Sequence, residues 1–247
     1  MNMTGNTIFI TGGGSGIGRG LAEAFHKLGN QVIISGRRKT ALEDTIRANP
    51  GIAAIELDIE NPASIQAATE RLTTAYPRLN VLINNAGIML PDTTAEAQDD
   101  AQLVSTVTTN FIGPLRVTSA LIEHLKAQPS ATIVYNTSVL AFVPMAATSV
   151  YSATKAALHS YVLSQRFKLR NTAVKVIELA PPWVRTDLMN SREAEAAMPL
   201  EEFLQGVMKQ LATDAEEILV GNAEQLRANP GPNEGAFVTQ FNVSLPF

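Results

Sequence analysis

A tyrosine, a lysine and a serine are spaced in a way that suits proton transfer to a reacting oxygen. Tyr151 and Lys155 begin a segment of helical period, and Ser138 directly follows a β-branched run. Residues four apart share a helix face, so the ammonium can lie near the phenol. An unperturbed phenol has a pKa near about 10, and a neighbouring cation favours phenolate and lowers that pKa toward a catalytic range. A helix that carries both residues by coincidence is the alternative.

A glycine-rich turn lies near the start of the chain. A β-branched run over residues 7–11 leads into the segment from Thr11 to Gly18, and a helical pattern follows at once. Glycines let the backbone approach a pyrophosphate, whose charge is met by the free amides of a helix N-terminus. The alternative is an ordinary strand-to-helix turn. The predicted dinucleotide contacts here are Gly12, Gly14, Ser15, Gly16, Ile17 and Gly18.

Two arginines follow the second β-branched run, which ends Ser35-Gly36-Arg37-Arg38. An acidic residue at this point would bind the ribose 2′-hydroxyl of NAD. Without that carboxylate, a guanidinium can pair with a 2′-phosphate through charge-assisted hydrogen bonds. Arg37 and Arg38 therefore favour NADP(H) as the cofactor. Their alternative role is to begin a solvated helix.

Polar residues also close the third and fourth runs. An aspartate at the end of a strand can accept a hydrogen bond from an adenine amino group, and asparagine amides can tie neighbouring strands together beneath a cofactor. Both residue types also form ordinary turns and helix caps. The further predicted cofactor contacts are Asp58, Ile59, Asn85, Ala86 and Gly87.

Six β-branched runs alternate with segments of helical period, which predicts an α/β fold. The expected architecture is a doubly wound (Rossmann) parallel sheet with helices on both faces, and ligands beyond the carboxyl ends of its strands. Residues 217–220 are the single candidate for a seventh strand. The expected strands are 7–11, 31–35, 53–57, 81–84, 132–136 and 174–179, and the expected helices are 16–28, 39–48, 62–75, 101–126 and 151–170.

Composition restricts the class of protein further. The 247 residues carry 19 basic and 23 acidic side chains, a net charge of −4 that argues against a nucleic-acid or anionic-lipid partner. No linker divides the chain, so one domain is expected over residues 1–247. The absence of cysteine excludes disulfides and thiolate sites. It is consistent with the cytoplasm, which residues 1–5 also favour because they lack the features of a signal peptide.

Two other features could suggest a membrane span or a metal site, and neither interpretation is favoured. Residues 127–154 contain no charged side chain, but polar residues and prolines interrupt the stretch, so a buried strand and a pocket loop are expected rather than a membrane span. His26, His124 and His159 fall in helical patterns without metal-ligand spacing. They are interpreted as structural or solvated, and no metal is predicted.

These motifs together resemble the short-chain dehydrogenase/reductase family, of the compact single-domain type, over about residues 5 to 190. The resemblance implies a doubly wound fold and an NADP(H)-dependent oxidoreductase acting on a carbonyl or alcohol. It implies that Tyr151 is the general acid/base and that Ser138 steadies the substrate oxygen. Lys155 would lower the Tyr151 pKa and bind the nicotinamide ribose. Asn110 matches the family's catalytic asparagine, which supports a water chain to the lysine.

The sequence departs from the family's pattern after the sixth run. Family members often have Pro-Gly where this chain has Pro181 and Pro182, so the backbone is expected to be stiffer there. Pro181, Val184 and Thr186 still match the positions that contact the nicotinamide. The family's usual seventh strand is not evident, which makes a tetramer built through that edge doubtful.

The substrate and the partners are predicted from apolar residues near the expected site. They favour a small hydrophobic ketone or alcohol. A lid is expected at about residues 187–212 and a tail at about 229–247, and a homo-oligomer is expected, a dimer being favoured, through helices 101–126 and 151–170. The alternatives are a catalytically silent NADP(H)-sensing module and an epimerase or dehydratase with tightly held NAD. The expected pocket residues are Met89, Leu90, Leu140, Phe142, Met145, Trp183 and the segment 188–198.

Overall fold

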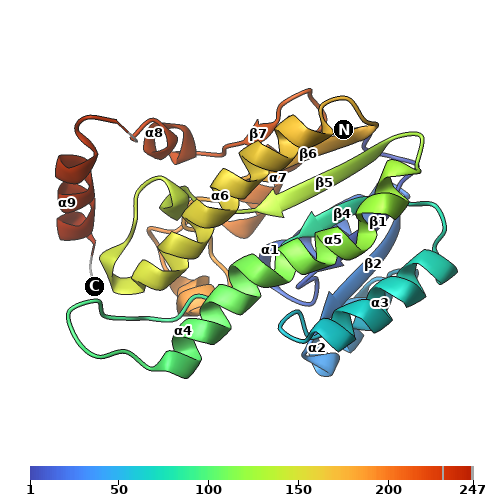
Figure 1. Cartoon of the computed structure of the whole chain (residues 1–247), viewed down its shortest axis with the longest axis horizontal. Coiled ribbons are helices and arrows are strands. Elements are labelled where there is room, and N and C mark those ends of the chain that lie inside the picture. The colour runs from blue at the N-terminus through green and yellow to red at the C-terminus, as the bar shows by residue number, and fades with distance from the viewer. Residues whose placement is uncertain (230, 246–247) are drawn as a thin grey trace.

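The computed structural model describes residues 1–229 and 231–245 and centres on one parallel sheet (Figure 1). The strand order is β3-β2-β1-β4-β5-β6-β7. The chain therefore adds strands on one side of β1 up to β3 and on its other side from β4 onward, so the strand order reverses between β1 and β4. All six predicted strands are confirmed to within two residues. The strands are β1 (Thr7–Thr11), β2 (Gln31–Gly36), β3 (Ala53–Glu56), β4 (Leu79–Asn84), β5 (Ala131–Asn136), β6 (Val174–Leu179) and β7 (Glu217–Ile218).

The seventh strand lies within the segment that was its single candidate. β7 has two residues and pairs with the end of β6, Glu217 opposite Glu178 and Ile218 opposite Leu179. Ile218 is fully buried. The pairing with β6 involves only these two positions. A strand this short leaves almost no periodic signal in a sequence, because strand patterns are recognised over four or more residues.

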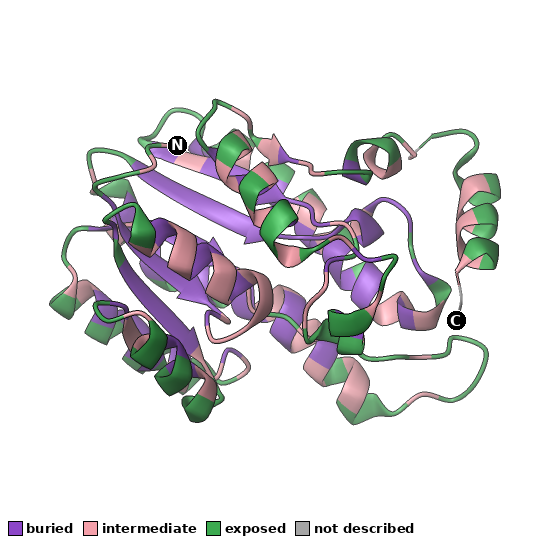
Figure 2. Cartoon of the chain, turned by 180° about the vertical axis from the view of Figure 1, so that it is seen from behind, coloured by how far each residue is buried: buried purple, intermediate pink, exposed green. Residues whose placement is uncertain are grey.

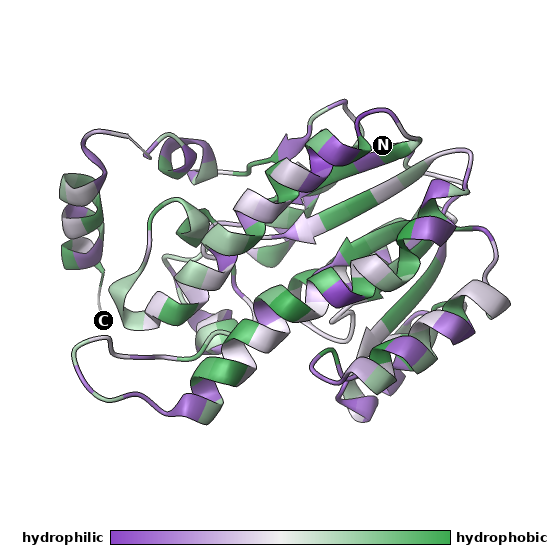
Figure 3. Ribbon diagram, in the orientation of Figure 1, coloured by the Kyte–Doolittle hydropathy of each residue, from purple (hydrophilic) through white to green (hydrophobic). Residues whose placement is uncertain are grey.

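Helices cover both faces of the sheet, as predicted. Alternate residues of each strand point to opposite faces, and Ile8 and Ile10 belong to one core cluster whereas Phe9 belongs to the other. Figure 2 shows the buried strands between the two helical layers, and Figure 3 shows apolar residues along the strands. The helices are α1 (Gly16–Lys27), α2 (Lys39–Ala48), α3 (Pro62–Ala75), α4 (Asp100–Val107), α5 (Gly113–Lys126), α6 (Ser149–Leu169), α7 (Leu200–Leu211), α8 (Ala223–Arg227) and α9 (Glu234–Ser244).

The helix predicted over residues 101–126 is present over residues 100–126, but its α-helical hydrogen-bond pattern is interrupted. A π-helical turn, Thr108–Ile112, separates α4 from α5. Gly113 ends this turn against Ile59, and a Cβ there would lie 2.6 Å from the isoleucine side chain. Single π turns inside helices often occur at functional positions, and this one contains Asn110. The predicted helix is therefore present, and the π turn within it is a local departure that the sequence pattern did not indicate.

The uncharged segment 127–154 forms a strand, a loop and a helix start. It includes β5, two short 3₁₀ turns at Val139–Ala141 and Ala146–Thr148, and the first turns of α6. The expected strand and loop are thus present. Within residues 1–229 and 231–245, no helix combines the length and the apolar character needed to cross a membrane.

Specific contacts hold the described parts of the segments in which a lid and a tail are predicted. Residues just before the segment 187–212 bind to it: the Arg185 guanidinium donates to the carbonyl oxygens of Ala194 and Ala197, and Val184 forms a β-bridge with Met198. In the tail, the Asn242 amide donates to the Pro144 carbonyl oxygen at 2.9 Å. Helix α9 therefore lies beside the loop that follows β5. Residues 230, 246 and 247 of the predicted tail lie outside the described residues.

Candidate active site

A cavity of about 890 Å³ lies at the carboxyl edge of the sheet, where the direction of winding reverses. Ligands of doubly wound folds bind at this point. The structure brings most of the predicted site residues to its walls. Those that line it are Gly12, Gly14, Ser15, Gly16, Ile17, Arg37, Arg38, Ile59, Asn85, Ala86, Gly87, Ser138, Tyr151, Lys155, Pro181, Val184 and Thr186. Gly18, Asp58 and Asn110 lie outside this lining.

The glycine-rich turn is bonded to the end of β4. The Asn85 side-chain amide donates to the carbonyl oxygens of Thr11 at 3.0 Å and Gly12 at 3.1 Å. Gly12 has a φ of +68°, and a Cβ on it would lie 2.9 Å from the Ala86 Cα. The Ser15 side chain accepts no hydrogen bond from α1, so the first-turn amides of that helix stay available to an anion. The turn therefore fits a dinucleotide diphosphate.

Gly18 lies beneath this turn. A Cβ on Gly18 would lie 2.3 Å from both the Asn85 amide nitrogen and the Gly12 carbonyl oxygen. The backbone at Gly12 is thus in direct contact with the first turn of α1. Gly18 contributes close packing under the loop, which is a different role from the ligand contact that the sequence suggested.

The two arginines already have partners at the rim of the cavity. The Arg37 guanidinium pairs with the Glu60 carboxylate at 2.8 Å, and Arg38 donates to the Ser15 hydroxyl at 2.9 Å. Glu60 also accepts from the Thr109 hydroxyl at 2.8 Å. The sequence analysis missed Glu60. Its position could have identified it, because Glu60 comes just after Asp58 and Ile59 at the same edge of the sheet.

Asp58 forms a turn rather than part of the cavity wall. Its carboxylate accepts from the Glu60 backbone N–H at 3.1 Å, and its own N–H donates to the Ser64 hydroxyl at 3.0 Å. The adjacent Leu57 and Ile59 line the cavity instead. This is the alternative that turn-forming residues of this type leave open.

Helix α6 and the end of β5 bring the three reactive side chains together. Tyr151, Lys155 and Ser138 are all buried, and all three line the cavity. The Ser138 hydroxyl hydrogen-bonds the Tyr151 phenol, while Lys155 Nζ donates to the Asn136 carbonyl oxygen at 2.8 Å. Lys155 Nζ lies 5.4 Å from the centre of the Tyr151 ring. The arrangement can hold an oxygen atom beside a phenol and an ammonium.

Burial controls the ionisation of both groups. Desolvation raises the pKa of Tyr151 to about 12, although the hydrogen bond from Ser138 opposes part of this rise. Desolvation also lowers the pKa of Lys155 to about 8. The lysine therefore does not lower the tyrosine pKa below its ordinary value in this structure, contrary to the expectation from sequence, because the cost of burying phenolate is larger. At neutral pH the phenol is protonated.

The lowered pKa of Lys155 predicts a stability that depends on pH. The folded state releases this proton near pH 8, whereas an unfolded lysine keeps it up to its ordinary 10.5. The unfolded state thus binds more protons, and the free energy of unfolding is expected to rise by about 1–2 kcal/mol from pH 8 to 9.5. Tyr151 acts in the opposite direction, but only as the pH rises above about 10, where an unfolded tyrosine ionises and the buried one does not.

Urea unfolding at several pH values across this window tests the expectation. Lys155→Met removes the titrating group and keeps a chain of similar length, so its stability is expected to rise less with pH than that of the unchanged chain. Equal slopes in the two proteins would contradict the assignment.

Asn110 lies directly behind the cavity wall. Its Oδ1 accepts from the Ile88 N–H at 2.8 Å, and its Nδ2 donates to the Ile88 carbonyl oxygen at 2.8 Å. A Cβ on Gly87 would lie 3.3 Å from Asn110 Oδ1 and 3.8 Å from Lys155 Nζ. The glycine therefore lets the asparagine and the lysine come close to each other. The π turn holds Asn110 at this position.

The far side of the cavity is mainly apolar. Met89, Leu140, Met145, Trp183 and parts of the 188–198 segment line it, as predicted, whereas Leu90 and Phe142 do not. Phe142 is 2% exposed and packs beneath the loop. Sequence reasoning missed a wall contributed by the end of the chain. These further lining residues are Asn222, Leu226, Phe241 and Leu245.

Comparisons with known proteins agree with this geometry. The family model described as short chain dehydrogenase matches residues 6–197. The uncharacterized oxidoreductase DltE of Bacillus subtilis (strain 168) is 40% identical over 236 residues, 92% of each chain. A short chain dehydrogenase from Burkholderia cenocepacia J2315, solved in complex with NADP, is 26% identical, with a TM-score of 0.85 over 97% of this chain and 98% of its own. A short chain dehydrogenase/reductase from Burkholderia phymatum, solved in complex with NAD, shares the fold. It is 20% identical, with a TM-score of 0.85 over 100% of this chain and 99% of its own.

Proposed function

Since the chain belongs to the short-chain dehydrogenase/reductase family and is an oxidoreductase, we propose that it transfers a hydride between NADP(H) and a carbonyl or alcohol carbon. The substrate is small and hydrophobic, and Tyr151 moves the proton. The observation that carries the proposal is the meeting of Ser138, Tyr151 and Lys155 in one cavity with the glycine-rich turn. The turn is suited to a diphosphate, and the phenol is suited to a substrate oxygen.

The chemistry follows from the state of these side chains. When bound, the nicotinamide cofactor donates or accepts the hydride. Tyr151, protonated at neutral pH, gives its proton to the carbonyl oxygen as charge develops there. Ser138 donates a hydrogen bond to the same oxygen and holds it in line. Lys155 lies at the base of the cavity and stabilises the phenolate that proton transfer leaves.

NADP(H) is proposed over NAD because two guanidinium groups lie at the rim of the cavity. Arg38 hydrogen-bonds the Ser15 hydroxyl, Arg37 pairs with the Glu60 carboxylate, and both arginines line the cavity. The relative solved with NADP is in accord with this choice. A 2′-phosphate can accept charge-assisted hydrogen bonds from such groups.

Removing these charges is expected to reduce the preference for NADPH. Arg37→Ala and Arg38→Ala should each weaken NADPH binding by about 10- to 100-fold, because a hydrogen bond to a charged group contributes about 1.5–3 kcal/mol. NADH binding should change by less than about twofold. Fluorescence titration of both cofactors measures this, with the exposed Arg47→Ala as a matched control on α2. Equal affinities for the two cofactors before and after substitution would remove the argument.

The proposed substrate class follows from the apolar walls. Met89, Leu140, Met145 and Phe241 face the cavity, and such surfaces favour aliphatic or aromatic carbonyl compounds. The test is a panel of apolar and charged ketones and aldehydes mixed with NADPH, in which loss of reduced cofactor is followed by absorbance. Turnover of the apolar members supports the proposal. Activity confined to highly charged compounds would end the assignment of substrate class.

The same assay separates the two alternatives. A catalytically silent NADP(H) sensor would bind NADPH and oxidise none of it with any carbonyl. An epimerase or dehydratase would hold NAD tightly and show no net consumption of added NADPH. The presence of Asn110, Ser138, Tyr151 and Lys155 around one cavity favours turnover, since a sensor needs no proton shuttle.

A dimer is proposed on the exposed apolar face of two helices. Val104 on α4 and Leu163 and Phe167 on α6 are exposed large apolar side chains, and α4 packs beside α6. Covering such a surface with a second copy would remove it from water. Light scattering measures the mass in solution, and a monomer at all concentrations would contradict the proposal.

A further inference from the structure

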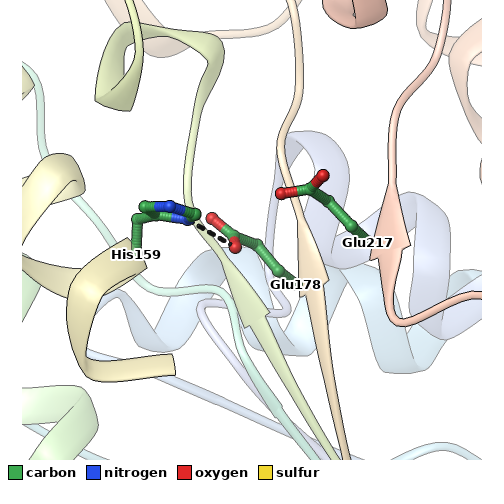
Figure 4. A group of neighbouring side chains, drawn as sticks. All are labelled: His159, Glu178 and Glu217. Atoms are coloured by element: carbon green, nitrogen blue, oxygen red, sulfur yellow. Dashed lines mark hydrogen bonds and ion pairs between the residues drawn. The ribbon is translucent and has the colours of Figure 1, made fainter. Parts of the chain in front are cut away.

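A buried carboxylate lies next to the site without lining its cavity. Glu178, at the end of β6, has a side chain with no exposed surface. One oxygen accepts from the Thr137 hydroxyl at 2.7 Å, and the other lies 2.7 Å from His159 Nδ1 on α6 (Figure 4). Burying a carboxylate is costly unless hydrogen bonds and positive charge offset the loss of water. Thr137 lines the cavity, whereas Glu178 and His159 do not, and the proposed function assigns none of these three residues a role.

Their positions repeat the spacing of the reactive residues. Tyr151, Lys155 and His159 are four apart on α6, so they lie along one helix face. This face meets three consecutive residues at the end of β5, namely its last residue, Asn136, and the two that follow it, Thr137 and Ser138. Tyr151 bonds with Ser138, Lys155 donates to the Asn136 carbonyl oxygen, and His159 reaches Thr137 through Glu178. Each residue at the strand end is thus tied to a different turn of one helix.

A metal ion is not the better explanation of this cluster. His159, Glu178 and Glu217 place ligand atoms within 4.8 Å of one another, a separation that a cation could bridge. However, the Arg227 guanidinium already donates to Glu217 at 2.8 Å, and both Glu178 oxygens have partners. A positive side chain therefore lies against the second carboxylate, that of Glu217, where it would repel a bound cation. The cluster is satisfied by the protein's own groups.

The same cluster supports the loop behind the cavity wall. The Phe142 ring packs edge to face against the His159 ring, with 5.0 Å between the ring centres. The guanidinium of Arg227, on α8, lies 4.6 Å from the centre of the Phe142 ring. Phe142 follows Leu140 in the loop whose residues line the cavity. Movement of His159 would therefore affect both Thr137 and this loop. None of the hydrogen bonds described for His159, Glu178 and Glu217 reaches the glycine-rich turn.

We propose that His159 and Glu178 are positioning residues that hold the end of β5 against α6 and so set the distance between Ser138 and Tyr151. The inference rests on the proposed function. The pair touches neither substrate nor cofactor, and it acts through Thr137 on the neighbouring serine. Because a misplacement of about 1 Å can cost about 10²-fold in rate, a modest loosening here has a measurable effect.

Two isosteric changes and two matched controls test this role. Thr137→Val and His159→Gln remove one bond each to Glu178. Thr132→Val alters a buried threonine at the other end of β5, and His124→Gln alters a half-buried histidine on α5 that bonds the Leu79 carbonyl oxygen. We expect kcat per folded molecule to fall about 10-fold or more in the first pair and less than about twofold in the controls. The KM for NADPH should stay within about twofold in all four.

A double variant distinguishes a shared path from two separate losses. If both residues act through Glu178, Thr137→Val combined with His159→Gln should lower kcat by little more than either change alone. Independent effects would multiply instead, to about 100-fold, and that result would contradict the proposed connection. Thermal unfolding of every variant gives the folded fraction, so a purely structural loss is removed from kcat.

A measurement without turnover keeps the inference separate from the proposed function. Tyrosine labelled with ¹³C at the ring carbon bearing the hydroxyl gives one NMR signal per tyrosine, and Tyr151→Phe identifies the signal of Tyr151. This signal should move by more than its linewidth in Thr137→Val and His159→Gln and stay fixed in both controls. A moved signal in a protein that reduces no carbonyl would uphold the inference and count against the proposed function.

Two results would overturn the inference. One is a Tyr151 signal that stays fixed in both test variants, whatever happens to turnover. The other is a moved signal in an active enzyme whose kcat matches the controls, because the pair would then alter the tyrosine without positioning it for the reaction.

Discussion

Tyr151→Phe is expected to lower kcat for carbonyl reduction by about 10²–10⁴-fold, which is the usual contribution of an oriented acid or base. The ring is 7% exposed, and its packing is retained in phenylalanine, so the change removes only the hydroxyl that gives the proton. NADPH binding should stay within about twofold, because the glycine-rich turn is unchanged. Stopped-flow absorbance of bound NADPH with a substrate from the carbonyl panel measures the loss.

Tyr161→Phe is the matched control for this experiment. Tyr161 lies on the same helix, is partly buried, and bonds to Gln165 away from the cavity. Its loss should leave kcat within about twofold. Undiminished turnover in Tyr151→Phe would refute the proposed role of the phenol. Binding without turnover in the unchanged chain would instead favour an NADP(H) sensor.

Gly18→Ala is expected to abolish most cofactor binding and to destabilise the fold by about 1–3 kcal/mol, the typical cost of overpacking. The added methyl would lie 2.3 Å from the Gly12 carbonyl oxygen, which is backbone, and equally close to the Asn85 amide that ties the turn to β4. Relief requires the turn to move off α1. Since that turn presents the amides suited to a diphosphate, we expect NADPH affinity to fall about 100-fold or more.

Gly20→Ala is a close control, because it adds the same methyl to the same helix at the same nominal distance. The methyl at Gly20 would lie 2.3 Å from a terminal carbon of Leu204, which can rotate away. We expect it to leave NADPH affinity within about twofold, and alanine also has the better helix propensity. Equal losses from both substitutions, measured by fluorescence titration and urea unfolding, would mean that contact with the turn is not the cause.

Local patterns in the sequence predicted much of the fold and most of the cavity lining. Strand ends are marked by a change from β-branched to polar residues, and in a parallel sheet every such end lies at one edge. Residues such as Ser138, Asn85 and Arg37 were found in this way because each directly follows a strand. Tyr151 and Lys155 were found because helix periodicity places them together. These signals span only a few residues.

The remaining features depend on contacts between distant segments. The Glu178 carboxylate meets His159 across 19 residues and Thr137 across 41, and no spacing in the chain indicates this meeting. The π turn at Asn110 also escaped prediction, because its residues fit a helical pattern. The predicted lowering of the Tyr151 pKa was wrong for a related reason, since burial raises it. Burial depends on the packed structure, whereas the neighbouring lysine is visible in the sequence.

The end of the chain builds one wall of the cavity, and its attachment has a consequence for specificity. Phe241 on helix α9 and Leu245 just after it reach the cavity, and Asn242 fastens this helix to the loop after β5, whereas the reactive side chains belong to the sheet edge and α6. This part of the wall is therefore separable from the residues that are proposed to react with the substrate. Exchanging this last segment for another sequence would retune preference among substrates while the redox machinery stays intact.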